Sequence, residues 1–177
     1  MPRNSAWLSA LRPGDENVRR LNAMTMHIEA ATEADLPALT KLLALLFAQE
    51  AEFTPNPEAQ CSGLLRIITN RDVGIVLVAK EGESVLGMVI LLYTVSTALG
   101  GRVALLEDMV VGPKARGGGI GSHLLQRAVA VAEAAGCLRI TLLTDQHNLS
   151  AQRFYTRHGF TPSSMVPMRL HLAVSQS

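Results

Sequence analysis

The sequence has little surplus charge, few cysteines and no histidine cluster. A formal net charge of +1 gives no general attraction to nucleic acid, so no nucleic-acid partner is expected. Cys61 and Cys137 lie far apart and form no Cys-x-x-Cys pair, which predicts reduced, structural thiols in a cytoplasmic protein. The five histidines show no ligand spacing with these cysteines, so no metal site is expected.

Long hydrophobic runs and aromatic residues are also scarce. No apolar run approaches the about 20 residues that span a bilayer, and Ala6 to Leu11 is too short for a signal peptide, so no membrane partner is expected. Aromatic residues make up 4% of the 177 residues, whereas 48% are hydrophobic and only 18% are charged. This balance predicts a compact domain rather than a disordered chain, and the apolar excess is compatible with a buried face between subunits.

Hydrophobic periodicity predicts strands and helices over most of the chain. Residues 1–25 lack it and are interpreted as a flexible N-terminal extension before a single domain at 26–177. The late elements alternate between strand and helix, whereas the middle ones form hairpins, which predicts an α/β fold with a mixed, mostly antiparallel sheet covered on both faces. The expected strands are 27–31, 74–79, 85–94, 105–111 and 139–144 with a final hairpin from Phe160, and the expected helices are 36–50, 57–70, 119–135 and 150–158.

The most informative stretch runs from Leu105 to Gly121 and reads as a strand, a glycine-rich turn and the start of a helix. The first N–H groups of a helix have no partner within it, and the helix dipole adds partial positive charge there. Glycines let the backbone approach a large ligand and reach positive φ. The turn therefore predicts a site for a phosphate or diphosphate, with Arg116 as a cation at its rim.

Three motifs compete for this turn. A dinucleotide fingerprint fails because its last glycine would fall on Ser122 or Leu124, and a P-loop fails because no Gly-Lys-Ser/Thr follows. A merely flexible connection is disfavoured because four glycines in five residues would cost backbone entropy without return. Arg116, Gly119 and Gly121 instead fit Arg-x-x-Gly-x-Gly, which resembles the pyrophosphate loop of the GNAT superfamily of acetyl-CoA-dependent N-acetyltransferases.

A second motif resembles the same family. It comprises an asparagine, an alanine three residues on, Phe-Tyr and then Gly-Phe, matched here by Asn148, Ala151, Phe154, Tyr155, Gly159 and Phe160. The resemblance covers about residues 28–172 and implies a GNAT-like acyl-CoA N-acyltransferase fold with acetyl-CoA (coenzyme A) as co-substrate. The Leu-Glu-Asp run before the loop is similar to that of diamine and polyamine acetyltransferases. The resemblance also implies a homodimer, and this expectation rests only on the fact that members of the family are commonly dimeric.

The resemblance also implies which residues hold acetyl-CoA. Strand backbone at Met109 and Val111 would pair with the pantetheine arm, and a strand amide at Met109 or Val110 would face the thioester oxygen. Asn148 would bind pantetheine or tie its loop to the neighbouring strand. The diphosphate would be held by backbone amides of Arg116, Gly117, Gly118, Gly119, Ile120, Gly121 and Ser122.

Two side chains are candidates for proton transfer. Tyr155 is the candidate acid for the leaving thiolate and a donor-site residue, because an unperturbed phenol with a pKa near ~10 can protonate a thiolate. Glu107 is the candidate base. Asp108 is expected to be a solvated or capping group, because neighbouring strand residues face opposite sides unless a bulge intervenes.

These features predict an N-acetyltransferase that transfers acetyl from acetyl-CoA to a primary amine of a small molecule by direct attack in a ternary complex. Two alternatives stay open: acetylation of a protein or peptide, and a regulatory module that binds acyl-CoA without turnover. Glu50 and Glu52 could face an amine substrate, although a solvated loop is the favoured interpretation there.

Overall fold

The computed structural model describes residues 25–48 and 55–172 and divides the chain into two units, the first ending at Leu143 and the second beginning at Thr144. Residues 1–24 of the expected extension and the loop with Glu50 and Glu52 lie outside the described residues. No helix in the described part of the chain is both long and apolar enough to cross a membrane.

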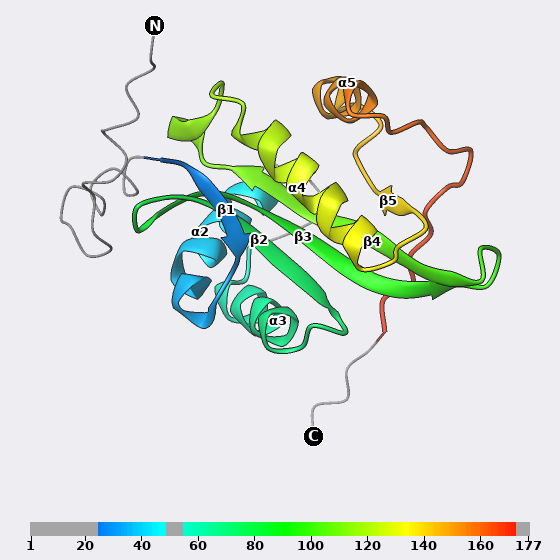
Figure 1. Ribbon diagram of the computed structural model, residues 1–177, viewed down its shortest axis with the longest axis horizontal. Coiled ribbons are helices and arrows are strands. Elements are labelled where there is room, and N and C mark those ends of the chain that lie inside the picture. The colour runs from blue at the N-terminus through cyan, green and yellow to red at the C-terminus, as the bar shows by residue number, and fades with distance from the viewer. Residues whose placement is uncertain (1–24, 49–54, 173–177) are drawn as a thin grey trace, which may run out of the picture. The chain divides into compact units, whose positions relative to one another are not determined.

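The first unit is built on one five-stranded sheet (Figure 1). Its strands lie in sequence order, with antiparallel pairing from the first to the fourth and parallel pairing between the fourth and fifth. This confirms the expected mixed, mostly antiparallel sheet. The strands are β1 (His27–Ala30), β2 (Gly74–Glu81), β3 (Ser84–Ser96), β4 (Gly101–Val111) and β5 (Ile140–Leu142).

Helices cover both faces of this sheet. On one face, α2 (Leu36–Phe47) and α3 (Pro57–Thr69) form a buried cluster with strand side chains that include Met88, Ile90 and Val110. On the other face, α4 (Ile120–Ala134) lies across the sheet (Figure 1). Its Leu124 and Leu125 are completely buried. Strand side chains alternate between the two faces, so the apolar runs of β2 and β3 are buried on both.

Local sequence signals set the helix ends. The Thr32–Asp35 capping box forms, with the Thr32 N–H donating to Asp35 Oδ2 at 2.8 Å, before a 3₁₀ turn (η1, Glu33–Asp35). At the end of α4, Gly136 adopts φ 73°, its N–H donates to Glu133 O, and the Cys137 N–H donates to Ala132 O. These two bonds form a Schellman motif, in which Gly136 is the residue after the cap.

A charge cluster that the sequence did not predict ties the first turn to β2. Lys80 Nζ lies 2.8 Å from Asp35 Oδ1 and 2.9 Å from Glu29 Oε1, and a bulge between Ala79 and Lys80 interrupts the β2–β3 ladder there. Burial by itself would raise the pKa of Asp35, but hydrogen bonds from Lys80 and Thr32 outweigh it and lower that pKa. The cluster therefore stabilises the ionised carboxylate inside the fold.

The second unit contains α5 (Leu149–Arg157), close to the expected helix. The expected final hairpin from Phe160 is wrong: no residue between 160 and 172 is assigned to a strand. The alternation of Met168, Leu170 and Leu172 specifies one face of a strand, but a strand forms only where a neighbouring strand completes its hydrogen bonds.

Candidate functional site

The two adjacent carboxylates lie in a β-bulge in the middle of β4. Val89 pairs with Met109 and Leu91 pairs with Leu106, so both Glu107 and Asp108 stand opposite the single residue Ile90. Two β4 residues thus occupy a place where regular pairing puts one.

Because of this bulge, Glu107 and Asp108 do not face opposite sides of the sheet, as they would in a regular strand. Val89 and Leu91 share one face of the sheet, so their partners Met109 and Leu106 lie on that face too. Glu107 and Asp108, which lie between these partners, are therefore on the opposite face, together with Ile90. That is the face covered by α2 and α3. Glu107 is exposed, whereas Asp108 is half-buried and interacts with another group of the protein. Glu107 is therefore the more accessible of the two carboxylates.

The last residues of β4 direct backbone groups away from β3. Gly112 N–H donates to Leu86 O at 2.8 Å, and because a trans peptide points its N–H and C=O in opposite directions, the Val111 carbonyl faces away from β3. Arg116 Nε donates to this carbonyl at 3.1 Å. In antiparallel pairing the N–H of Val111 faces the same way as its carbonyl.

The β4–β5 ladder does not extend to that point, because it pairs only Ala104, Leu105 and Leu106 with β5. The Val111 amide therefore lies on a strand edge beyond the end of β5. Val110, by contrast, lies opposite Met88 in the β3 ladder with its side chain in the core. Of these two neighbours, only Val111 presents its backbone to the open edge.

The glycine loop follows directly from this edge. A 3₁₀ turn (η2, Pro113–Ala115) leads to Arg116, whose N–H turns back to Pro113 O at 3.5 Å. Gly117 and Gly119 then have φ of 84° and 78°, a region that favours glycine, and Gly119 is the residue that precedes α4. The sequence did not predict the Arg116–Val111 contact, since no local pattern marks it.

The amides of this loop have no hydrogen-bond acceptor within the described part of the chain. The first bond of α4 runs from His123 N–H to Gly119 O, so the preceding N–H groups are not used by the helix. A Cβ added at Gly117 would meet no atom within 4 Å, and one at Gly118 only Ala115 O at 3.9 Å. The amides concerned are those of Gly117, Gly118, Gly119, Ile120, Gly121 and Ser122. Together they form a cradle of donors that fits an anion.

The other candidate residues lie in the second unit. Asn148 caps α5, with its Oδ1 accepting from Ala151 N–H at 3.0 Å, which explains the three-residue spacing of this motif. Tyr155 is half-buried, and its ring makes edge contacts with Phe154 and Phe160 at centroid distances of 5.3 and 5.7 Å. Burial raises the pKa of Tyr155, so the phenol keeps its proton at neutral pH.

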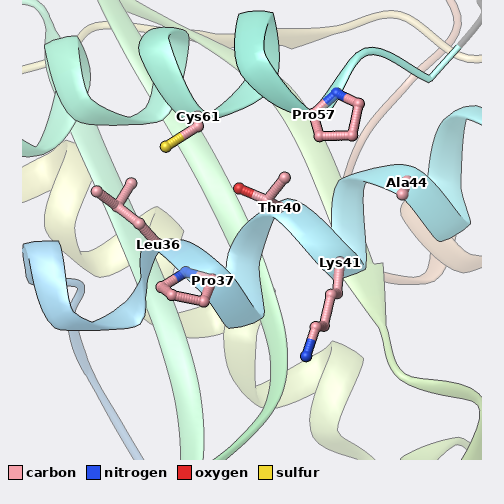
Figure 2. Close-up of a pocket in the computed structure, with 7 residues that line it drawn as sticks. All are labelled: Leu36, Pro37, Thr40, Lys41, Ala44, Pro57 and Cys61. Carbon is pink, nitrogen blue, oxygen red and sulfur yellow. The ribbon is translucent and has the colours of Figure 1, made fainter.

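A separate groove of about 360 Å³ lies between α2 and α3 (Figure 2). Thr40 and Cys61 lie between the two helices, whereas the Lys41 side chain extends away from α3 (Figure 2). The groove contains neither carboxylate of the bulge and is lined by Leu36, Pro37, Thr40, Lys41, Ala44, Pro57 and Cys61. Its apolar lining offers no acid–base pair, so it is not the candidate active site. Among the described residues, no three His, Cys, Asp or Glu side chains gather as a metal site would need.

Comparison with known proteins connects this arrangement to an enzyme family. An uncharacterised N-acetyltransferase of Bacillus subtilis, YhfO, is 30% identical over 137 residues, which span 76% of this chain and 89% of that protein. The aminoalkylphosphonate N-acetyltransferase of Salmonella typhimurium is 29% identical over 146 residues, or 82% and 92% of the two chains. The crystal structure of a possible acetyltransferase from Clostridium difficile 630 matches with a TM-score of 0.76 at 15% identity, over 84% of this chain and 99% of that one.

The family model described as "Acetyltransferase (GNAT) family" matches residues 37–160. This range includes the bulge, the glycine loop and α5. Members of this family use acetyl-CoA as co-substrate. The chain therefore belongs to the GNAT family and is an N-acetyltransferase.

Proposed function

We propose that this enzyme transfers the acetyl group of acetyl-CoA directly to the primary amine of a small molecule while both substrates are bound. The observation that carries the proposal is the layout of β4. One strand holds two carboxylates in a bulge at Glu107 and Asp108, then an outward amide at Val111, and leads straight into the donor cradle of the glycine loop.

The cradle is the proposed site for the diphosphate of acetyl-CoA. The amides of residues 117–122 lack acceptors in the described structure and sit at the positive end of α4. Arg116 adds charge at the rim, and its bond to Val111 O holds the loop against the strand end. Met109 and Val111 would then meet the pantetheine arm by strand-like pairing. An outward amide such as that of Val111 could also stabilise the oxyanion.

Glu107 is the proposed base for the amine. An alkylamine with a pKa near ~10 is mostly protonated at neutral pH, so it must lose a proton, directly or through water, before it attacks the thioester carbon. Glu107 is exposed on the α2–α3 face of the sheet, whereas Asp108 is half-buried and already engaged. These differences support Glu107 over its neighbour.

Tyr155 is the proposed acid. Attack of the nitrogen forms a C–N bond, collapse of the tetrahedral adduct breaks the C–S bond, and the departing thiolate takes a proton. A phenol is protonated at neutral pH, and burial raises the pKa of Tyr155 further, so Tyr155 holds a proton that it can supply to the thiolate. Asn148 is proposed to contribute its amide group to pantetheine binding while its oxygen caps α5.

A small amine is the proposed acceptor because the Salmonella relative acts, by its name, on an aminoalkylphosphonate. The Leu-Glu-Asp run of β4 is similar to that of diamine and polyamine acetyltransferases, which also supports a small amine as the acceptor. We also propose a cytoplasmic location, since both Cys61 and Cys137 are free thiols.

Release of free coenzyme A thiol over a panel of amines tests the proposal. Small primary amines should give turnover, and Glu107→Gln should lower kcat by about 100-fold or more, as removal of a general base does. Asp108→Asn is the matched control and should lose less than about tenfold. A larger loss in Asp108→Asn would move the base to Asp108.

The same panel separates the alternatives. Turnover with peptides but with no small amine would indicate a protein acetyltransferase. Tight binding of acetyl-CoA by calorimetry, with no thiol release from any amine or peptide, would indicate a binding module.

A further inference from the structure

An exposed histidine lies beside the glycine loop. His123 is near the start of α4 and is exposed to solvent. A Cβ added at Gly119 would lie 3.8 Å from the Cε1 atom of its imidazole. Helical side chains point back towards the helix N-terminus, so the ring of His123 covers the turn that begins at Gly119. The imidazole therefore lies next to the amides that form the donor cradle.

The chain around this histidine carries only positive charge. No carboxylate occurs between Asp108 and Glu133. The charged or titratable side chains of that stretch are Lys114, Arg116, His123 and Arg127. Arg127 follows His123 by four residues, so the two exposed side chains are neighbours on one side of α4, and their like charges repel when the imidazole is protonated. An anion at this end of α4 relieves that repulsion.

The sheet beneath α4 contributes one carboxylate near this end of the helix. A Cβ added at Gly87 would lie 3.2 Å from Leu124 Cδ1, so the first half of α4 crosses β3 there. Gly87 pairs with Ala79, and strand alternation puts Glu81, two residues further on, on the same face of the sheet. Glu81 is exposed. In the described part of the chain, His123 forms no ion pair with Glu81 or with any other carboxylate.

The other polar groups on the α4 face of the sheet lie towards the far end of the helix. Tyr93 and Arg102 share this face, and the Arg102 guanidinium lies 4.8 Å from the centre of the Tyr93 ring. The Arg102 carbonyl accepts a hydrogen bond from Leu138 N–H, which follows the C-terminal end of α4. These two side chains are therefore remote from His123.

We propose that the protonated imidazole of His123 binds a phosphate group of acetyl-CoA, so that affinity for the donor increases as the pH falls. This inference rests on the proposed placement of the diphosphate in the cradle. Among the side-chain types gathered at this end of α4, histidine is the one whose charge ordinarily changes between about pH 5 and 8. An anion bound beside it favours the charged form, so proton uptake and donor binding strengthen each other.

The size of the effect follows from the charges involved. A unit positive charge about 5 Å from two phosphate charges in water-like surroundings corresponds to a roughly tenfold gain in affinity. The loop amides and Arg116 supply the part of the binding that does not depend on pH in this range. His123 therefore adjusts donor binding and is not required for it.

Calorimetric titration of the full chain with acetyl-CoA at about pH 5.5 and about pH 8 tests the proposal. At each pH the measured quantity is the Kd of His123→Gln divided by that of the wild type, and this ratio cancels the titration of the phosphates of the ligand itself. The ratio should be roughly ten at the lower pH and should lie within about twofold of one at the higher pH. The same ratio at both pH values overturns the proposal.

Two further variants separate a charge effect from a loosened fold. His123→Lys keeps a cation at both pH values, so near pH 8 it should bind acetyl-CoA about five- to tenfold more tightly than the wild type, which a damaged fold would not do. Arg127→Gln is the matched control, because arginine keeps its charge throughout this range. Its ratio to the wild type should agree within about twofold at the two pH values. A pH dependence as large as that of His123→Gln would contradict the assignment to the imidazole.

A second ligand identifies the phosphate concerned. Acetyl-CoA carries a diphosphate and a separate phosphate on its ribose. With acetyl-CoA that lacks the ribose phosphate, a persisting pH-dependent ratio assigns His123 to the diphosphate, and loss of the pH dependence assigns it to the ribose phosphate. Both results support binding of a phosphate by His123.

Gly119→Glu near pH 8 distinguishes failure of this inference from failure of the proposed site. If this variant binds acetyl-CoA as tightly as the wild type, the placement of the diphosphate is wrong and the inference on His123 falls with it. If it binds weakly while the ratio for His123→Gln is the same at both pH values, the cradle stands and only the role of His123 is refuted.

Discussion

Replacing Gly119 by glutamate tests the anion cradle most directly. Gly119 precedes α4 with φ 78° and ψ 0°, and only the Cε1 atom of His123, at 3.8 Å, would lie near an added Cβ. The substitution therefore meets no steric block. Its structural cost is the left-handed backbone, about 1–2 kcal/mol for a residue with a Cβ. In a chain of this length that lowers Tm by about 2–8 °C.

The functional cost is electrostatic and is measured separately from stability. A carboxylate about 4 Å from a diphosphate charge is repelled by about 1 kcal/mol per charge in water-like surroundings. Two such charges give about 2 kcal/mol, or roughly a 30-fold rise in the Kd of acetyl-CoA. Calorimetric titration with acetyl-CoA measures the Kd, and a thermal melt of the same sample measures the stability.

Gly136→Glu is the matched control. Gly136 has φ 73° and lies just beyond the other end of α4, so the variant adds the same charge and the same backbone strain away from the loop. It should melt as early as Gly119→Glu, or slightly earlier, because a carboxylate is unfavourable at a helix C-terminus. It should nevertheless bind acetyl-CoA with wild-type affinity. Equal Kd values in the two variants would refute the placement of the diphosphate.

Four further substitutions, the last of them a control, test the acid and the fold. Tyr155→Phe should lower kcat more than it raises the KM for acetyl-CoA, and a wild-type rate would remove Tyr155 as the acid. Asp35→Asn should cost about 2 kcal/mol at pH 7 in denaturant unfolding. Because the pKa of Asp35 is lowered on folding, this contribution is present above about pH 4 and is lost in more acidic solution. The two proteins should therefore converge in stability in acid, and a constant difference would contradict this reasoning. Leu39→Ala, at a fully buried position, should cost about 2–5 kcal/mol, whereas Leu45→Ala, at a 41% exposed one, should cost much less; similar losses would contradict the packing.

Much of the fold followed from short-range sequence patterns. The Thr32–Asp35 box, the Gly136 cap and the apolar runs of β2 and β3 each depend on residues within a few positions of one another. Such signals act through local hydrogen bonds and side-chain periodicity, which the sequence displays directly. The element order was predicted well for this reason, and the boundaries moved by only a few residues.

Contacts between distant residues did not follow in the same way. The expectation that Glu107 and Asp108 point to opposite faces assumed a regular strand, and the bulge that changes this depends on how β4 pairs with β3. The link from Lys80 to Asp35 joins residues 45 positions apart and was not foreseen. The hairpin expected after Phe160 did not form. The alternation of apolar residues predicts which side chains share a face, but it does not predict which strand they pair with.

The sequence by itself determined the family and the turn that can hold an anion, because glycines at Gly117 and Gly119 allow a positive φ that other residues resist. Tertiary structure alone decided that the bulge puts both carboxylates on the α2–α3 face and that the Val111 carbonyl turns outward to Arg116. The physical reason is the distance along the sequence over which each interaction acts. Backbone preference and capping act within one turn, whereas strand register is chosen by the partner strand and the core beneath it.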